Sequence, residues 1–329
     1  MLDPKVLLIY GRTNQHLGLW CDLENDERVI LRSTQLRVSK IFEKILYKLF
    51  VLYDRLAHTT IKHIFFQYND IYELIRDVSH FVVIDGALNI INVSELKKCK
   101  MINPNVKIYL YLLNSMDAQS PIMRGVRHKI GSFDWDNIYT FDSHDAQKYG
   151  YHYLGFNYYS LHKFDSSSQD VILQNDVFFV GGLKGGRTNM IYDIYSQLLA
   201  GNVKCDFYLM PSKDISLIQQ PGIFYYRGWR PYEDILKHVQ KANCILEIMQ
   251  KGQTGATLRY FEAVIMNKKL LTNNPNIVDF PFYNPKWMRI IENIDDIDVD
   301  WVKKREEIDY NYDGEFSPIH FIDYLLKKH

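Results

Sequence analysis

The segment 250–262 carries residues that could bind a diphosphate and a ribose. It follows an apolar run typical of a buried strand, turns at glycines, and enters a predicted helix near Thr257. Arg259 and Glu262 are three positions apart, so both lie on one face of this helix near its start. The helix N-terminus and Arg259 could hold a diphosphate, while the Glu262 carboxylate could accept hydrogen bonds from two ribose hydroxyls. The alternative is an ordinary helix with a surface Arg–Glu pair, which contributes about 0–1 kcal/mol to stability.

A second candidate is the glycine-rich segment that follows a strand predicted over 176–180. Its glycines, Gly182 among them, let the backbone approach phosphates closely, and Lys184 and Arg187 add positive charge. The spacing matches neither the dinucleotide-binding pattern nor the P-loop pattern, so a turn with solvated charges is the alternative. Asp206 follows at the distance of a ribose-binding acid, but it lies near the start of its predicted strand, which disfavours NAD binding.

Short apolar runs alternate with amphipathic patterns along the chain, and this alternation predicts parallel sheets covered by helices on both faces. The predicted strands are 6–10, 63–66, 81–85, 107–113, 137–141, 176–180, 204–210, 223–226, 244–249 and 269–272. The predicted helices are 35–56, 71–76, 93–101, 143–149 with Ser143 as N-cap, 189–199, 231–241, 257–266 and a last one within 317–328.

The polar stretch 162–170 is the clearest break in the pattern and predicts a linker between two domains. We therefore expect an α/β protein with two Rossmann-like, doubly wound domains that face a cleft. The N-terminal domain is expected over 1–162 and the C-terminal domain over 171–312. The segment 313–329 is expected to form a helix that packs back on the N-terminal domain. Such domains bind ligands at the carboxyl ends of their strands.

Charge and cysteine usage exclude several classes of protein. Lys+Arg and Asp+Glu both number 39, so the formal net charge is zero, whereas dedicated nucleic-acid-binding proteins usually carry a basic excess. We therefore expect no nucleic-acid partner. The four cysteines form no C-x-x-C pair and no metal-ligand spacing with histidine, so they are predicted to be small buried side chains, and no metal site is expected.

The chain shows no pattern of a secreted or membrane-spanning protein. Its first apolar run is short and lacks a cleavage site, and no run of about 18 apolar residues occurs, so we expect a cytoplasmic protein. Basic residues recur at helical spacing over 36–56, opposite apolar ones. Such a helix could rest on the inner face of the cytoplasmic membrane. The alternative is an ordinary helix with its apolar stripe on the sheet.

Several strings resemble one bacterial family. FDSHDAQKYGYHYL, FVGGLKGGR and above all QKGQTGATLRYFEAVIMNKKLLTNNPNI with FYNP are similar to lipopolysaccharide, capsular and exopolysaccharide biosynthesis proteins with a GT-B-type glycosyltransferase fold. The likeness covers roughly 135–285. It implies a nucleotide-sugar donor, with a UDP-sugar favoured, and no cofactor or metal. It also implies a donor pocket lined by Gln253, Thr254, Gly255, Arg259 and Glu262. Phosphate contacts are implied for Gly182, Lys184 and Arg187.

Transfer of the sugar requires stabilisation of the leaving diphosphate and orientation of an acceptor hydroxyl, which an inverting enzyme also deprotonates. The base is expected at a strand end of the N-terminal domain, where the candidates are Asp85, Asp117 and His16. Each could instead be a turn residue or a helix cap. Inversion or retention, the sugar, and the oligomeric state are left open.

The expected function is transfer of a sugar to a glycan acceptor, free or lipid-linked, in bacterial surface-polysaccharide synthesis. One alternative is a nucleotide-sugar epimerase of the same architecture, which would turn over the donor alone. A second is a non-catalytic GT-B-like subunit that scaffolds polysaccharide assembly.

Overall fold

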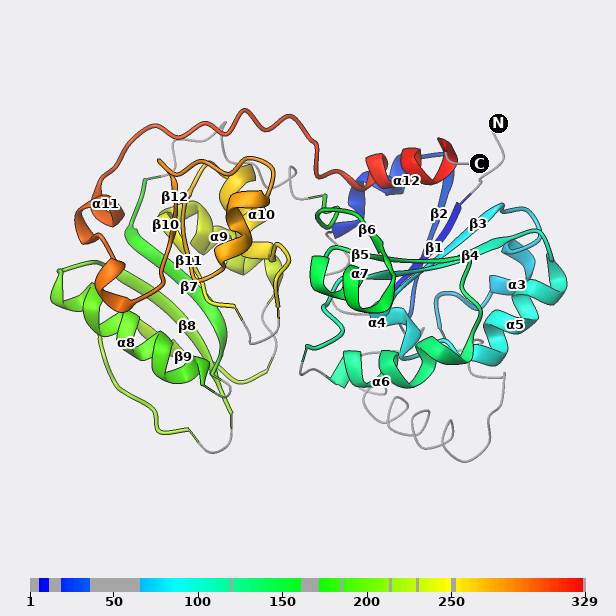
Figure 1. Ribbon diagram of the computed structural model, residues 1–329, viewed down its shortest axis with the longest axis horizontal. Helices are drawn as coiled ribbons and strands as arrows, with labels where there is room; N and C mark the ends of the chain where they lie inside the picture. Colours follow the sequence, from blue (N-terminus) through cyan, green and yellow to red (C-terminus); the bar gives the residue numbers. More distant parts are fainter. Residues whose placement is uncertain are drawn as a thin grey trace. The chain divides into compact units, whose positions relative to one another are not determined.

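The chain divides into two α/β units (Figure 1). In this computed structural model, unit 1 comprises Met1–Ser160 with Ser317–His329, and unit 2 comprises Leu161–Phe316. The residues that the structure describes are 6–11, 19–35, 66–118, 121–160, 172–183, 186–212, 215–228, 231–249 and 253–327.

Unit 1 is built on a parallel sheet, to which the described residues contribute six strands in the order β2-β1-β3-β4-β5-β6. Their bounds are β1 (Val6–Tyr10), β2 (Val29–Ser33), β3 (His80–Ile84), β4 (Lys107–Leu112), β5 (Asn137–Thr140) and β6 (His152–Tyr153). β3 is buried along its whole length, because helices cover both faces of the sheet. The order turns back at β1, which lies between β2 and β3.

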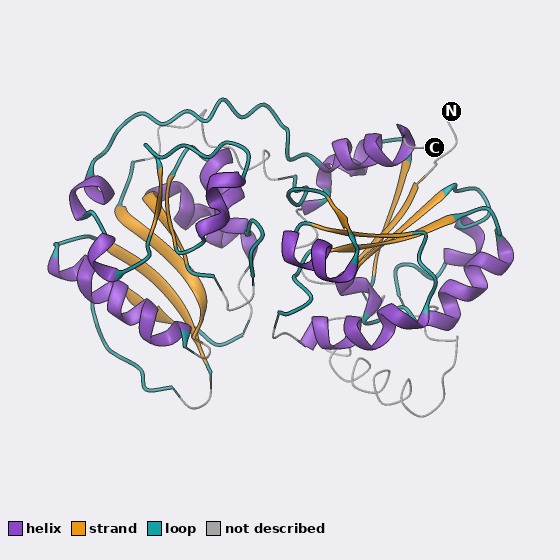
Figure 2. Ribbon diagram, in the orientation of Figure 1, coloured by secondary structure: helices purple, strands orange, loops and turns teal. Residues whose placement is uncertain are grey.

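Helices cover this sheet on both faces (Figure 2). Alternate side chains of β1, β3 and β4 share one apolar core with four helices. These are α3 (Ile71–Leu74), α4 (Asp85–Leu88), α5 (Val93–Ile102) and α6 (Pro121–Lys129). The last helix of the chain, α12 (Pro318–Lys327), covers the other face, where the Phe321 ring lies 4.8 Å from that of Tyr111. α7 (Ser143–Tyr149) follows β5, and the short 3-10 helices are η1 (Cys21–Asn25) and η3 (Ile130–Ser132).

Polar contacts fix α12 to unit 1. Tyr324 Oη lies 2.7 Å from His152 Nε2, and Arg28 forms an ion pair with Asp323 at 2.6 Å. The end of the chain therefore belongs to the same unit as its beginning.

Unit 2 repeats the architecture. The described residues form a second parallel sheet with the order β12-β11-β10-β7-β8-β9. The bounds are β7 (Asn175–Leu183), β8 (Cys205–Pro211), β9 (Ile223–Tyr225), β10 (Ala242–Glu247), β11 (Lys269–Thr272) and β12 (Met288–Ile290). α8 (Arg187–Ala200) and α11 (Val299–Lys303) pack on one face, and α9 (Tyr232–Lys241) and α10 (Leu258–Ile265) pack on the other (Figure 1). The 3-10 helices η5 (Pro275–Asp279) and η6 (Ile294–Asp296) lie in the connections.

The two-unit α/β fold predicted from the alternation is confirmed, with differences in detail. Strand β2 and helix α6 were not predicted, and β7 extends through Gly181 and Gly182, which were expected in a loop. Asp142, not Ser143, is the N-cap of α7, because its carboxylate accepts hydrogen bonds from the amides of His144 and Asp145. The helix predicted over 35–56 and the strand predicted over 63–66 lie almost wholly outside the described residues.

All four cysteines are buried, as expected, and none forms a disulfide. Within the described ranges, every helix is too short or too polar to span a lipid bilayer.

Candidate functional site

The strand order of unit 2 brings the two phosphate-binding candidates to one edge of its sheet. β7 is the first strand of this unit, and it pairs with β8 on one side and with β10 on the other. The segments after β7 and after β10 therefore leave the carboxyl edge at the point where the strand order reverses. This is the position where open α/β sheets bind nucleotides.

Glu247, the last residue of β10, forms hydrogen bonds that connect two strands to the start of α10. Its carboxylate accepts hydrogen bonds from the Thr272 hydroxyl at 2.5 Å and from the Thr257 hydroxyl. These two threonines end β11 and cap α10, so one buried carboxylate links two strands to the start of the helix. Burial raises the pKa of Glu247.

The loop before α10 is also held by side chains that follow β11. The side-chain amides of Asn274 and Asn276 each lie 3.4 Å from the Thr254 carbonyl oxygen and donate to it. Asn273 accepts a hydrogen bond from the Met249 amide at 2.7 Å and contacts the Met190 sulfur in the first turn of α8 at 3.6 Å. The carboxyl ends of β10 and β11 and the start of α8 are therefore adjacent.

Arg259 and Glu262 lie on one face of α10, as their spacing predicted, but this face is buried. The Glu262 side chain is fully buried and that of Arg259 is 12% exposed, and Arg259 Nη1 lies 2.5 Å from Glu262 Oε2. The Tyr232 hydroxyl donates to Glu262 Oε1 at 2.6 Å. Burial raises the pKa of Glu262 to about 7, against the opposing effects of Arg259 and Tyr232. The predicted contact of Glu262 with a ribose stays a prediction.

Arg187, the first residue of α8, has no counter-ion within the described part of the chain. Its guanidinium carbon lies 5.8 Å from the centre of the Phe179 ring, and a Cβ on Gly181 would come within 2.2 Å of its Nη2. Among the described residues no carboxylate pairs with it, and its Nε is buried without a hydrogen-bond partner. Burial lowers the pKa of Arg187, which means that the charge is poorly solvated.

A second cation of unit 2, Lys269, is buried together with its counter-ion and its hydrogen-bond acceptors. The Lys269 ammonium donates to the carbonyls of Trp301 and Lys304 and pairs with Glu306 at 3.3 Å. Among the residues that the structure describes, Arg187 has no such partners, and the glycine beside it leaves room for its guanidinium. An anion would supply the missing charge and hydrogen-bond acceptors.

The structure describes most of the other residues predicted to bind the donor. Gly182 lies in β7, and Gln253, Thr254 and Gly255 lie in the loop before α10. Lys184 is outside the described residues. Asp206 is the second residue of β8, and its carboxylate lies 2.8 Å from His238 Nδ1.

In unit 1, Asp85 follows β3 at the carboxyl edge and is fully buried. It accepts hydrogen bonds from the amides of Gly86 and Leu113, at 2.6 and 3.0 Å, and from the side chain of Asn114 at 2.9 Å. These contacts join the ends of β3 and β4. Burial raises the pKa of Asp85 to about 6, partly offset by the same hydrogen bonds.

Asp117 lies at the same edge but is accessible, with a side chain 38% exposed. The structure places His144 beside it, with Nε2 3.6 Å from Asp117 Oδ2, and Lys148 at 3.2 Å. His144 lies in the first turn of α7, which the buried Asp145 holds against the chain after β4 through the Met116 amide. Sequence reasoning missed His144, because only the packing of α7 brings it to Asp117.

The third base candidate, His16, lies outside the described residues. No group of three or more His, Cys, Asp or Glu side chains within the described ranges is arranged to hold a metal ion.

Comparison with known proteins shows the fold. No family model matches the chain, and no curated protein matches it in sequence. An alpha-glucosyltransferase, solved with UDP-glucose and DNA containing an abasic site, superposes with a TM-score of 0.50 and 10% identity, covering 84% of this chain and 82% of that one. A Listeria monocytogenes protein assigned as a UDP-N-acetylglucosamine 2-epimerase has a TM-score of 0.50 and 9% identity, covering 100% and 98%. The chain therefore has the GT-B-type fold that these two proteins share.

Proposed function

We propose that the protein is a glycosyltransferase that binds a nucleotide-sugar at the carboxyl edge of the unit 2 sheet. The observation that carries this proposal is Arg187, a poorly solvated cation that no described carboxylate neutralises, at the point where the strand order reverses. A diphosphate supplies the missing charge. Arg259 and the start of α10 follow the neighbouring strand, β10, and supply further positive charge.

A UDP-sugar is the favoured donor. One structural relative was solved with UDP-glucose and another is assigned an activity on a UDP-sugar. The chain shares their fold at low identity, so the choice of uridine is part of the proposal. The leaving diphosphate would be stabilised by Arg187 and Arg259, and by Lys184 as the sequence predicts, without a metal ion or cofactor.

The acceptor hydroxyl would be deprotonated at the carboxyl edge of unit 1. Asp117 and His144 are the accessible acid–base pair there, whereas Asp85 is buried and engaged in holding β3 to β4. In an inverting displacement, the hydroxyl proton passes to His144. The acceptor oxygen bonds to the anomeric carbon as the bond to the diphosphate breaks. Asp117, whose Oδ2 lies 3.6 Å from His144 Nε2, would help to orient the imidazole.

The acceptor is proposed to be a glycan, free or lipid-linked, in bacterial surface-polysaccharide synthesis. The resemblance of the segments within 135–285 to lipopolysaccharide, capsular and exopolysaccharide proteins supports this role. It implies a cytoplasmic location, with contact to the inner face of the membrane where the acceptor is lipid-linked.

A nucleotide-sugar epimerase is the second candidate, favoured by the likeness to the Listeria monocytogenes protein over the whole chain. The purified protein would be incubated with a panel of UDP-sugars, with and without glycan acceptors, and the products identified by mass spectrometry and NMR. We expect UDP release with a new glycosidic bond only when acceptor is present. Epimerised donor without acceptor would establish the second candidate, and nucleotide binding without turnover would indicate a scaffold subunit. Loss of activity on EDTA treatment would contradict the metal-free mechanism.

A further inference from the structure

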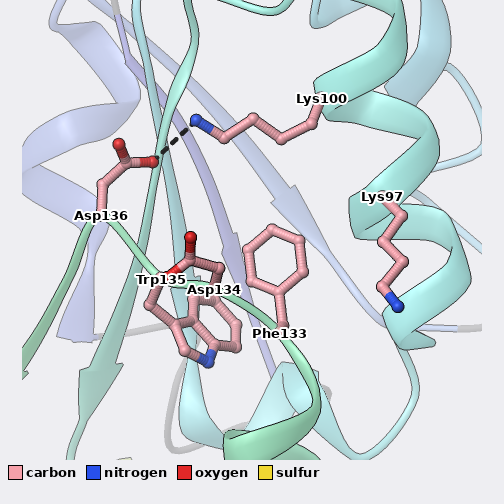
Figure 3. A pocket seen from close by; sticks show the side chains of 6 residues that line it. All are labelled: Lys97, Lys100, Phe133, Asp134, Trp135 and Asp136. Carbon is pink, nitrogen blue, oxygen red and sulfur yellow. Dashed lines mark ion pairs between the residues drawn. The ribbon is translucent and has the colours of Figure 1, made fainter.

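A pocket of about 340 Å³ lies at the edge of unit 1 opposite the one that carries Asp117 and Asp85. Helix α5 forms one wall, and the chain that leads into β5 forms the other (Figure 3). Its volume is within the range of about 300–1,000 Å³ for small-molecule sites. The lining residues are Lys97, Lys100, Phe133, Asp134, Trp135 and Asp136.

The two aromatic side chains of the pocket are held in place. The Trp135 indole N–H donates to the Ile130 carbonyl oxygen at 2.9 Å, so it needs no partner from a ligand. The Phe133 and Trp135 rings are 4.9 Å apart and nearly perpendicular. Both rings pack partly against the core of unit 1 and leave part of their surface to the pocket. A ligand would therefore meet a rigid apolar surface, which lowers the entropy cost of binding.

The charges of the pocket balance. Lys100 pairs with Asp136 at 2.9 Å (Figure 3), and it also donates to the Val106 carbonyl oxygen at 2.6 Å. Lys97 and Asp134 are exposed. The lining residues carry two ammonium groups and two carboxylates, so the pocket surface itself has no net charge with which to attract an anion. Lys107, outside the lining, shares Asp136 with Lys100. A nucleotide or a phosphorylated ligand would instead require a basic excess.

We propose that this pocket binds an uncharged sugar unit of a glycan. One face of a sugar ring is made of C–H groups, which bury apolar surface against Trp135 and Phe133. The hydroxyls at its rim match the donors and acceptors that Lys97 and Asp134 present. Aromatic surface combined with balanced charges fits a ligand that is apolar on one face and rich in hydroxyls at its edge.

The pocket would hold a part of the acceptor that does not react. It lies by the amino ends of β4 and β5, since Lys107 at the start of β4 pairs with Asp136 at 3.5 Å, while the proposed base lies at the carboxyl edge. A glycan bound at both places would be long, and binding at two sites raises its overall affinity. This part of the inference rests on the proposed glycosyltransferase function, whereas sugar binding itself does not.

Direct binding tests the pocket without reference to activity. Neutral oligosaccharides of increasing length, built from glucose, galactose or N-acetylglucosamine, would be titrated into the full-length protein and followed by calorimetry and by intrinsic tryptophan fluorescence, to which Trp135 is one of five contributors. We expect binding that Trp135→Ala abolishes. Because this ring also packs on the core, Asp134→Ala and Lys97→Ala serve as second variants that alter only exposed side chains, and each should weaken binding at least tenfold. Lys98→Ala, one position along α5, is the control and should bind like the wild type.

The outcomes separate this inference from the proposed function. If the Asp134 and Lys97 variants bind every oligosaccharide as the wild type does, or if only anionic ligands or peptides bind, the inference is wrong. If transferase activity is found, these variants should raise KM at least tenfold for long acceptors and leave kcat and KM for short acceptors unchanged. If no transfer is found but the oligosaccharides bind here, the proposed function fails and the sugar-binding pocket stands.

Discussion

Replacement of Glu262 by glutamine should change how the stability of the protein depends on pH. The Glu262 carboxyl is fully buried, with Arg259 on one oxygen and Tyr232 on the other, and its pKa is raised from 4.5 to about 7. The folded state therefore binds the proton more tightly than the unfolded state does. It follows that the free energy of unfolding falls as the pH rises through this interval.

The size of the effect follows from the shift. Each pKa unit corresponds to about 1.36 kcal/mol, so this group contributes about 3 kcal/mol of stability that is fully present below about pH 4.5 and lost by about pH 7. Glutamine keeps an acceptor for the Tyr232 hydroxyl but cannot ionise. The ion pair with Arg259 exists only when Glu262 is ionised, so its effect is already part of the pKa of about 7. The variant therefore differs from the wild type by the titration of this one group and by a constant offset.

Urea unfolding of the wild type and of Glu262→Gln would be measured from about pH 5 to about pH 8, with the slope m used to check that the same transition is followed. The difference in unfolding free energy between the two proteins should change with pH in favour of the variant as the pH rises. Glu233→Gln, an exposed change on α9, should show the same pH dependence as the wild type. If the unfolding free energies of Glu262→Gln and the wild type change with pH in parallel, the Glu262 carboxyl is not buried in a largely protonated form.

Three further changes test the site. Arg259→Ala should weaken UDP binding in calorimetry by about 1.5–3 kcal/mol, as for a hydrogen bond to a charged group. The control Arg305→Ala, at an exposed arginine, should leave the affinity for UDP unchanged. Equal affinities of the two variants would contradict the proposed donor pocket. His144→Gln should lower kcat by a factor of about 10²–10⁴ with donor affinity retained. The control His128→Gln, at an exposed histidine of α6, should leave kcat unchanged. A normal rate for the His144 variant would exclude His144 as the base. Thr257→Ala removes the N-cap of α10 and should cost about 1 kcal/mol in urea unfolding, so an unchanged midpoint would show that this cap contributes nothing.

The fold class and most of the secondary-structure elements could be predicted from the sequence alone. The apolar runs that became β1, β3, β4 and β10 alternate with helical patterns, and such local periodicity depends only on neighbours in the chain. The start of a helix near Thr257 and the shared helix face of Arg259 and Glu262 are likewise properties of consecutive residues. The short strand β2 and helix α6 escaped prediction.

The surroundings of these side chains depend on long-range packing, which the sequence did not reveal. The pairing of β7 with β10 joins Asn175 with Ala242, which are far apart in the chain, and no local pattern encodes such a pairing. The burial of Glu262, the meeting of Asp117 with His144, and the buried Nε of Arg187 arise because packed helices decide which polar groups lose water and which partners they gain. Periodicity therefore showed where the elements lie, whereas burial and long-range pairing decided which of their side chains could perform chemistry.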